Sequence, residues 1–185
     1  MNIIKKEGIR YGIILGLLLA LVTIFMFFNL TFFVNFWVGL GIKMSYIVMG
    51  IIAIYHVKKK QNGFISFKEA FTVFFIVFLI GIACQCLSNS IIFNGIDPKA
   101  KEIVKELFVE YTLTMSQKQG ITQEEIAKNI DIIKQSDDFS VPKLMQSALL
   151  NILPFSLIGF LMAWIFKNTH KQTIATQNTK ENQDV

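Results

Sequence analysis

The chain has 185 residues, of which 53% are hydrophobic and 17% are charged. Soluble domains average about 45–50% apolar and about 25% charged residues, so this composition argues against an ordinary soluble domain. The net charge of +5 would suit nucleic acid, but the basic residues stand at the ends of apolar segments. That placement excludes nucleic acid as the partner and indicates a lipid bilayer.

Four apolar segments are each long enough to cross a membrane: 9–28, 36–57, 70–93 and 147–166. A bilayer core about 30 Å thick requires roughly 20 apolar residues at a rise of about 1.5 Å each. We therefore expect an all-α membrane protein with four transmembrane helices, formed by one domain over 1–167. The first segment is longer than the apolar stretch of a signal peptide and no small-residue cleavage site follows it, so we expect a retained span.

The charges at the segment ends predict an orientation. Most basic residues lie before the first segment, between the second and third, and after the fourth, among them Lys5, Lys6, Lys58, Lys59 and Lys167. Basic residues near span ends stay in the cytoplasm. We therefore expect both termini in the cytoplasm and 94–146 outside it. The tail from 168 to 185 has few apolar residues and is expected to be disordered.

The entry to the third span is marked by two local motifs. Asn62-Gly63 predicts a tight turn after the second span, and Ser66 with Glu69 three residues later forms a capping box. The second and third spans are therefore expected to be antiparallel neighbours joined by a short, Lys-rich turn.

Two amphipathic helices are predicted in the extracytoplasmic segment 97–140. Asp97-Pro98 opens the first, with Asp97 as N-cap, and Gly120 ends it. Thr122 and Glu125 form a second capping box, which predicts a shorter helix through about Gln135.

Both external helices carry an apolar stripe with residues three and four positions apart, for example Ile103 and Leu107 in the first and Ile126 and Ile130 in the second. Such a stripe must be buried against something. Three possibilities stay open: a helical hairpin packed over the outer mouth of the bundle, a partner-binding surface, or contact with the lipid surface.

A polar cluster is predicted inside the spans. Gln85, Ser88 and Asn89 lie three and four residues apart, on one face of the third span, and Asn151 of the fourth span belongs to the same cluster. Amides at this depth need hydrogen-bond partners, so the cluster is expected to point into the bundle. Two interpretations stay open: hydrogen bonds that fix helix packing, or a substrate or ion site.

Residues that carry out chemistry are nearly absent from the spans. No carboxylate or Arg lies mid-span, which disfavours a proton- or ion-coupled carrier. Cys84 and Cys86 point about 200° apart on a helix, which disfavours a disulfide or shared metal site. His56 and His170 have no ligand spacing. We expect no catalytic residue, no metal and no cofactor.

Small residues recur every four positions in two spans, as Gly12, Gly16 and Ala20 in the first and as Gly159 and Ala163 in the fourth. Such rows let two helix backbones approach closely, so they predict helix-packing faces. The neighbouring helix is either in the same chain or in a second copy, and both possibilities stay open.

Two runs carry a resemblance to a known family. Residues 63–71 read Gly-Phe-Ile-Ser-Phe-Lys-Glu-Ala-Phe, and residues 93–98 read Phe-Asn-Gly-Ile-Asp-Pro. With the Gly12 to Gly16 opening, the external helical segment and the closing span, the chain over about 5–167 resembles the bacterial membrane family called domain of unknown function 4199. The resemblance implies a four-span protein of the bacterial cytoplasmic (inner) membrane. It implies no catalytic residue or ligand.

Two classes of function remain. The first is a noncatalytic structural, regulatory or partner-binding membrane module, suggested by the amphipathic external helices and the small-residue rows. Its partner is a second copy or another membrane protein. The alternative is a small-molecule carrier or channel that uses the polar face of the third span, formed by Gln85, Ser88 and Asn89.

The predicted orientation can be tested with a reporter enzyme that is active only outside the cytoplasm. The reporter should be active when fused after Gln119 and inactive when fused after Gln61, because the positive residues hold the Gln61 turn in the cytoplasm. Immunoblots of both fusions control for expression. The reverse activity pattern would show that the orientation is wrong.

Overall fold

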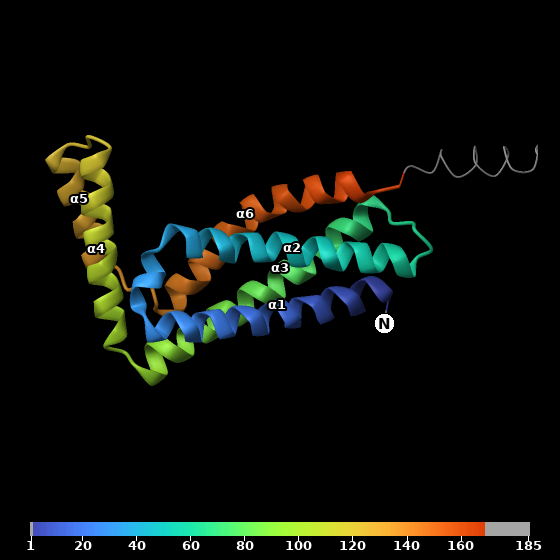
Figure 1. Ribbon diagram of the computed structural model, residues 1–185, viewed down its shortest axis with the longest axis horizontal. Coiled ribbons are helices and arrows are strands. Elements are labelled where there is room, and N and C mark those ends of the chain that lie inside the picture. Colours follow the sequence, from blue (N-terminus) through green and yellow to red (C-terminus); the bar gives the residue numbers. More distant parts are fainter. Residues whose placement is uncertain (1, 169–185) are drawn as a thin grey trace, which may run out of the picture.

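The computed structural model describes residues 2–168 and, over this range, contains six α-helices and two short irregular helices but no strand (Figure 1). The elements in chain order are α1 (Ile3–Phe28), the 3₁₀ helix η1 (Leu30–Val34), α2 (Phe36–Lys60), α3 (Phe67–Ser90), the π-helical turn η2 (Ile91–Ile96), α4 (Ala100–Lys118), α5 (Gln123–Gln135) and α6 (Val141–Phe166).

Four of these helices have the length and apolarity of membrane spans: α1, α2, α3 continued by η2, and α6. Their 25 to 30 residues exceed the roughly 20 that a bilayer core requires. The expected all-α, four-span fold class is confirmed at this level. Three helices begin before their apolar segments, α1 at Ile3, α3 at Phe67 and α6 at Val141, because polar residues at their ends also form helical turns. The helix α2 begins at Phe36, where its segment begins.

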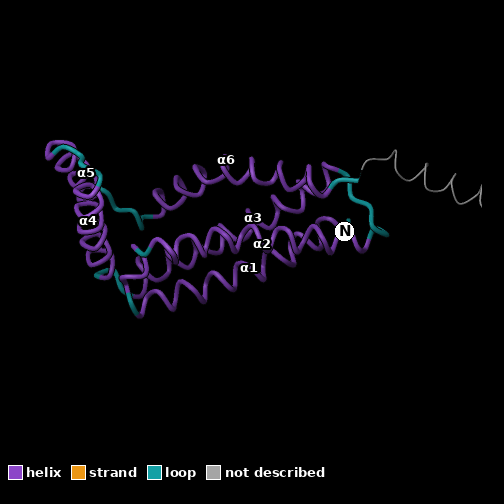
Figure 2. The backbone as a smooth tube through the Cα atoms, turned by 45° about the horizontal axis from the view of Figure 1, so that its top comes forward, coloured by secondary structure: helices purple, strands orange, loops and turns teal. Residues whose placement is uncertain are grey.

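The spans form a bundle around α3. This helix packs against α1, α2 and α6, whereas α2 and α6 hardly contact each other. Figure 2 shows α6 standing apart from α1 and α2 along the bundle. The N-terminus, the turn from α2 to α3 and the end of α6 lie at one end of the bundle (Figure 1).

The first small-residue row lies against α3 of the same chain. A Cβ atom added to Gly12 would lie 2.8 Å from Ile80 Cβ, and one added to Gly16 would lie 2.5 Å from Cys84 Sγ. Such distances leave no room for a side chain, so glycine is what allows the two helices to meet. Ala20 continues the row and is half-buried.

The second small-residue row also faces α3. A Cβ on Gly159 would lie 2.9 Å from a ring carbon of Phe74, and Ala163 is fully buried. Both predicted packing faces therefore have a neighbour within the chain. A second copy would have to use a different surface.

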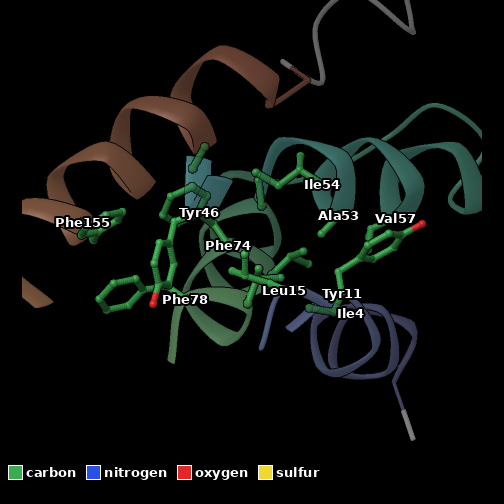
Figure 3. Close-up of a cluster of buried hydrophobic side chains, with 14 of the residues drawn as sticks. Ile4, Tyr11, Leu15, Tyr46, Ala53, Ile54, Val57, Phe74, Phe78 and Phe155 are labelled. Carbon is green, nitrogen blue, oxygen red and sulfur yellow. The ribbon is translucent and has the colours of Figure 1, made fainter. Parts of the chain in front are cut away.

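One apolar core fills the bundle, and Figure 3 shows its side chains converging from the four spans. Leu15, Phe74 and Phe78 are buried at its centre, with Tyr46 beside them. Large apolar side chains also cover the outside of the spans, for example Leu153. An apolar exterior around a packed apolar core fits a protein that has lipid as its solvent.

An ion pair between a buried carboxylate and an exposed lysine joins α1 to α2 near the N-terminus. Glu7 is only 1% exposed, and Lys60 Nζ lies 2.6 Å from its Oε1 atom. Its other oxygen, Oε2, lies 3.8 Å from Arg10 and accepts no hydrogen bond among the described residues. Glu7 precedes the predicted apolar segment 9–28, so it does not contradict the expectation that no carboxylate lies mid-span. Its burial was not predicted, because a charge at the sequence edge of an apolar segment looks exposed.

The capping box at the start of α3 is confirmed. The Ser66 hydroxyl accepts the backbone N–H of Glu69 at 3.3 Å, and Glu69 Oε2 accepts the backbone N–H of Ser66 at 2.9 Å. The Asn62-Gly63 turn before it has positive φ at both residues, +54° and +87°, a conformation that these residue types tolerate best.

Two predicted caps differ in detail. Asp97 is not the N-cap of α4: its carboxylate accepts the N–H groups of Lys99 and Ala100, which closes a turn, and the helix begins only at Ala100. Thr122 caps α5 through the N–H of Glu125, but the Glu125 carboxylate accepts the Thr122 hydroxyl instead of a backbone N–H. A short polar side chain such as Asp or Thr has several hydrogen-bond partners within reach. The sequence therefore predicts the position of the turn better than it predicts which hydrogen bond forms there.

The helices α4 and α5 lie side by side across the other end of the bundle (Figure 1). Val104 of α4 is buried against Ile92 and Phe93 of η2 in a second apolar cluster, while Ile126 of α5 is also buried. Much of the stripe is therefore covered within the chain. Ile103 remains 49% exposed.

The α1–α3 contact predicts a difference between two Gly-to-Ala substitutions. Gly16→Ala should lower the free energy of unfolding by about 1–3 kcal/mol, because the new methyl group overpacks against Cys84. The matched control is Gly41→Ala, since a Cβ there meets nothing within 4 Å. Denaturant unfolding in mild detergent measures both, and equal stabilities would contradict the close contact.

Candidate functional site

Two hollows lie in the half of the bundle that carries α4 and α5. The larger has a volume of about 480 Å³ and the smaller about 280 Å³. Both are lined by Gly39, Ile42, Gln85, Asn89 and Ser147, from α2, α3 and α6. Because they share these walls, we treat them as one space and call it the end cavity.

Gln85 lies on the wall of the end cavity and is bonded across the bundle. The Tyr46 hydroxyl donates to Gln85 Oε1 at 2.8 Å. Tyr46 lies 39 positions away on α2, so this bond joins two spans. The packing interpretation of the polar cluster therefore describes Gln85 well, although its amide also faces a hollow.

Asn89, one turn further along α3, has a different environment. Its Oδ1 atom is buried and accepts no hydrogen bond among the described residues. A buried carbonyl without a donor costs about 1–3 kcal/mol. Asn89 lines both hollows, so a molecule in the end cavity that carries a donor would remove this cost.

Ser88 and Asn151 bond to their own helices. The Ser88 hydroxyl donates to Cys84 O at 2.9 Å, and Asn151 Nδ2 donates to Ser147 O at 2.8 Å. Asn151 still lines the smaller hollow beside Gln85 and Asn89. The structure thus brings three of the four predicted residues to one cavity and places Ser88 outside its lining.

Aromatic rings close the cavity toward the middle of the bundle. Tyr46, Phe78 and Phe155 pack together, with ring centroids 4.6 Å apart for Phe78 and Phe155 and 5.3 Å for Tyr46 and Phe155. Beyond them lie the buried apolar side chains of the core. These three rings are the floor of the end cavity.

A second aromatic group lies at the other end of the cavity. Phe93 of η2 and Phe139 of the α5–α6 link have ring centroids 3.9 Å apart, and Phe33 of η1 packs edge-on against both. Phe33, Phe139 and Phe108 of α4 line the larger hollow. The helix α4 and the α5–α6 link therefore contribute to the cavity as well as covering the bundle end.

Three charged side chains line the cavity. Lys43 borders the smaller hollow, and Lys143 and Asp138 border the larger one. No sequence motif marks any of these three residues. Their positions relative to the helix starts could have indicated them. Each lies about two turns or less from the start of α2 or α6, at the depth where the polar face of α3 ends.

No cluster of three or more His, Cys, Asp or Glu residues with metal-binding geometry occurs within residues 2–168. Cys84 and Cys86 are both free thiols. Cys84 lies against α1 at Gly16, and Cys86 Sγ lies 3.7 Å from Leu144 O of α6. His170 and the tail from 169 lie outside the described residues, whereas Asn168 donates its backbone N–H to Ile65 O.

Comparison with known protein families identifies the chain. A family model described as "Protein of unknown function (DUF4199)" matches residues 10–168. The chain belongs to the DUF4199 family. This confirms the resemblance seen in the sequence. No curated protein and no solved structure matches the chain, so the end cavity of this DUF4199 protein has to be interpreted from its own residues.

The Tyr46–Gln85 bond of this DUF4199 protein predicts a coupling between two spans. Tyr46→Phe should lower the free energy of unfolding by about 0.5–1.5 kcal/mol, since it removes one buried hydrogen bond. The loss should largely vanish in a Gln85→Met background. Denaturant unfolding in detergent measures the cycle, with Tyr55→Phe on the exposed side of α2 as the matched control. Equal losses in both backgrounds would exclude the bond.

Proposed function

We propose that this protein is a noncatalytic membrane module that binds a ligand or partner segment in the end cavity. The main observation in support is the cavity itself. The side-chain amides of Gln85, Asn89 and Asn151 line it, and the Asn89 carbonyl accepts no hydrogen bond among the described residues. Amides and hydroxyls of this kind recognise a molecule by hydrogen bonds. They do not form the nucleophile and base pair that covalent catalysis uses.

The one-sided shape of the cavity favours binding over passage. The floor of Tyr46, Phe78 and Phe155 separates it from the opposite end of the bundle. A solute that enters beside α4 would stop at these rings. Such a closed floor fits a module that holds its ligand at one face of the membrane.

The proposal places the protein in the bacterial cytoplasmic membrane with both termini in the cytoplasm. Figure 1 shows the start of α1, the α2–α3 turn and the end of α6 at the same end of the bundle. That end carries Lys5, Lys6, Lys58, Lys59 and Lys167, and basic flanks favour the cytoplasmic side. The end cavity and the pair α4 and α5 then face the outside.

A partner protein or a second copy would bind to the exposed surface of α4 and α5. The small-residue rows are occupied by α3, so they do not supply an interface. Ile103 and Ile132 remain exposed on the helix pair. The external pair is therefore the surface that best fits a regulatory or structural partner.

The second candidate, a small-molecule carrier, is favoured by one feature. Pro154 lies inside α6 directly before the floor residue Phe155. A proline within a helix removes one backbone hydrogen bond and permits a bend. Bending of α6 at this level would move Phe155 and open the floor, which is the motion a carrier requires.

The binding proposal is tested by photocrosslinking in intact cells. A benzophenone amino acid in place of Phe32, which lines the larger hollow, should yield an adduct of one defined mass. The matched control is the same replacement at Phe28, which is 82% exposed and should yield only the mixture of bulk lipids. Mass spectrometry of the purified adducts provides the measurement.

Identical adduct mixtures at both positions would exclude a specific occupant and with it the binding proposal. Uptake into vesicles distinguishes the carrier. If the captured molecule crosses vesicles containing the wild type but not the Gln85→Leu, Asn89→Leu variant, the protein transports its ligand. If neither preparation gives flux, the molecule is bound and not carried.

A further inference from the structure

Three side chains around the end cavity lie within about one helical turn of the same depth. The Tyr46–Gln85 bond sets α2 and α3 in register, so Lys43 and Asn89, each about one turn nearer the α4 end, are level with each other. The contact of Cys86 Sγ with Leu144 O, 3.7 Å, brings the start of α6 to the level of Cys86, within about one turn of Asn89. Lys143 precedes Leu144 and completes this ring.

The charge around this ring is positive. Lys43 and Lys143 line the cavity together with one acidic residue, Asp138. Lys143 lies in the first turn of α6, where the helix dipole adds partial positive charge. The N-cap residue Ser140 makes no capping bond with its side chain. An anionic group therefore fits this position better than a neutral or cationic group.

Apolar side chains make up much of the remaining lining, and the cavity is open toward the lipid. Met26, Phe32, Ile42 and Leu150 line the larger hollow, and Leu150 is exposed on the outside of α6. The helices α2 and α6 both border the cavity although they hardly contact each other. A hydrocarbon chain can therefore leave the cavity between these helices without crossing a polar barrier.

We propose that the end cavity binds one anionic phospholipid whose headgroup carries hydroxyl groups, as in phosphatidylglycerol. The phosphate lies between Lys43 and Lys143, and a headgroup hydroxyl donates to Asn89 Oδ1, which lacks a donor. One acyl chain follows the apolar wall past Leu150 into the membrane. This inference rests on the proposed function, because it names the ligand class for the same cavity.

The test uses the purified full-length protein in mild detergent and native mass spectrometry. Phosphatidylglycerol should bind with one-to-one stoichiometry and should raise the unfolding temperature, whereas phosphatidylcholine with the same acyl chains should do neither. Lys43→Gln combined with Lys143→Gln should weaken binding by about tenfold or more, since each lysine loses its attraction to the phosphate. Asn89→Leu should weaken it while leaving the lysines in place.

The matched control is Lys59→Gln, an exposed lysine at the opposite end of the bundle, which should leave binding unchanged. The double variant and the Lys59→Gln control should both unfold at the wild-type temperature without added lipid, because all three lysines are exposed. Equal binding of phosphatidylcholine, or equal weakening by Lys59→Gln, would overturn the proposal. So would equal stabilisation by glycerol phosphate, which has no acyl chain. A defined adduct at Phe32 together with any of these results would keep the binding function and exclude this ligand.

Discussion

The close approach of α1 and α3 is the contact on which the rest of the bundle depends. Within a bilayer, burying apolar side chains against one another gives little net gain, so association relies on close packing. Gly12 and Gly16 allow that packing against Ile80 and Cys84. With one side of α3 occupied by α1, its remaining faces serve α2 and α6, and these two helices have no common seam of their own.

The end cavity follows from this arrangement. Halfway along the bundle, the rings of Tyr46, Phe78 and Phe155 fill the space between α2 and α6. One to two turns nearer α4, the facing residues are small: Gly39 on α2 and Ser147 on α6. Small side chains on helices held apart by larger ones leave unfilled volume, so the hollow is a consequence of the helix spacing that the aromatic floor sets.

Features that depend on neighbours in sequence could be predicted, whereas features that depend on helix rotation could not. The spans, the Ser66 capping box and the end of α5 follow from local periodicity and short-range hydrogen bonds. The inward direction of Gln85 and Asn89 also follows, because amides avoid lipid. The difference in their hydrogen bonding could not be predicted. Gln85 accepts a hydrogen bond from Tyr46, 39 positions away, while Asn89 Oδ1 has no donor among the described residues.

Glu7 shows the same limit at the other end. Its burial requires Lys60, 53 positions later, and no local pattern links the two. The two ends of the bundle differ in how their lysines are partnered. At the Glu7 end, Lys60 pairs with the carboxylate, and Lys58 donates to Phe166 O at 3.0 Å, so α1, α2 and α6 are tied together. At the cavity end, Lys43 and Lys143 form no ion pair among the described residues, and the Asn89 carbonyl stays without a donor. Buried polar groups are costly unless they are paired, and Glu7 Oε2 and Gln61 Oε1 also lack a hydrogen bond among the described residues. Asn89 Oδ1 differs from them because it belongs to a residue that lines the end cavity, where an external molecule can supply the donor.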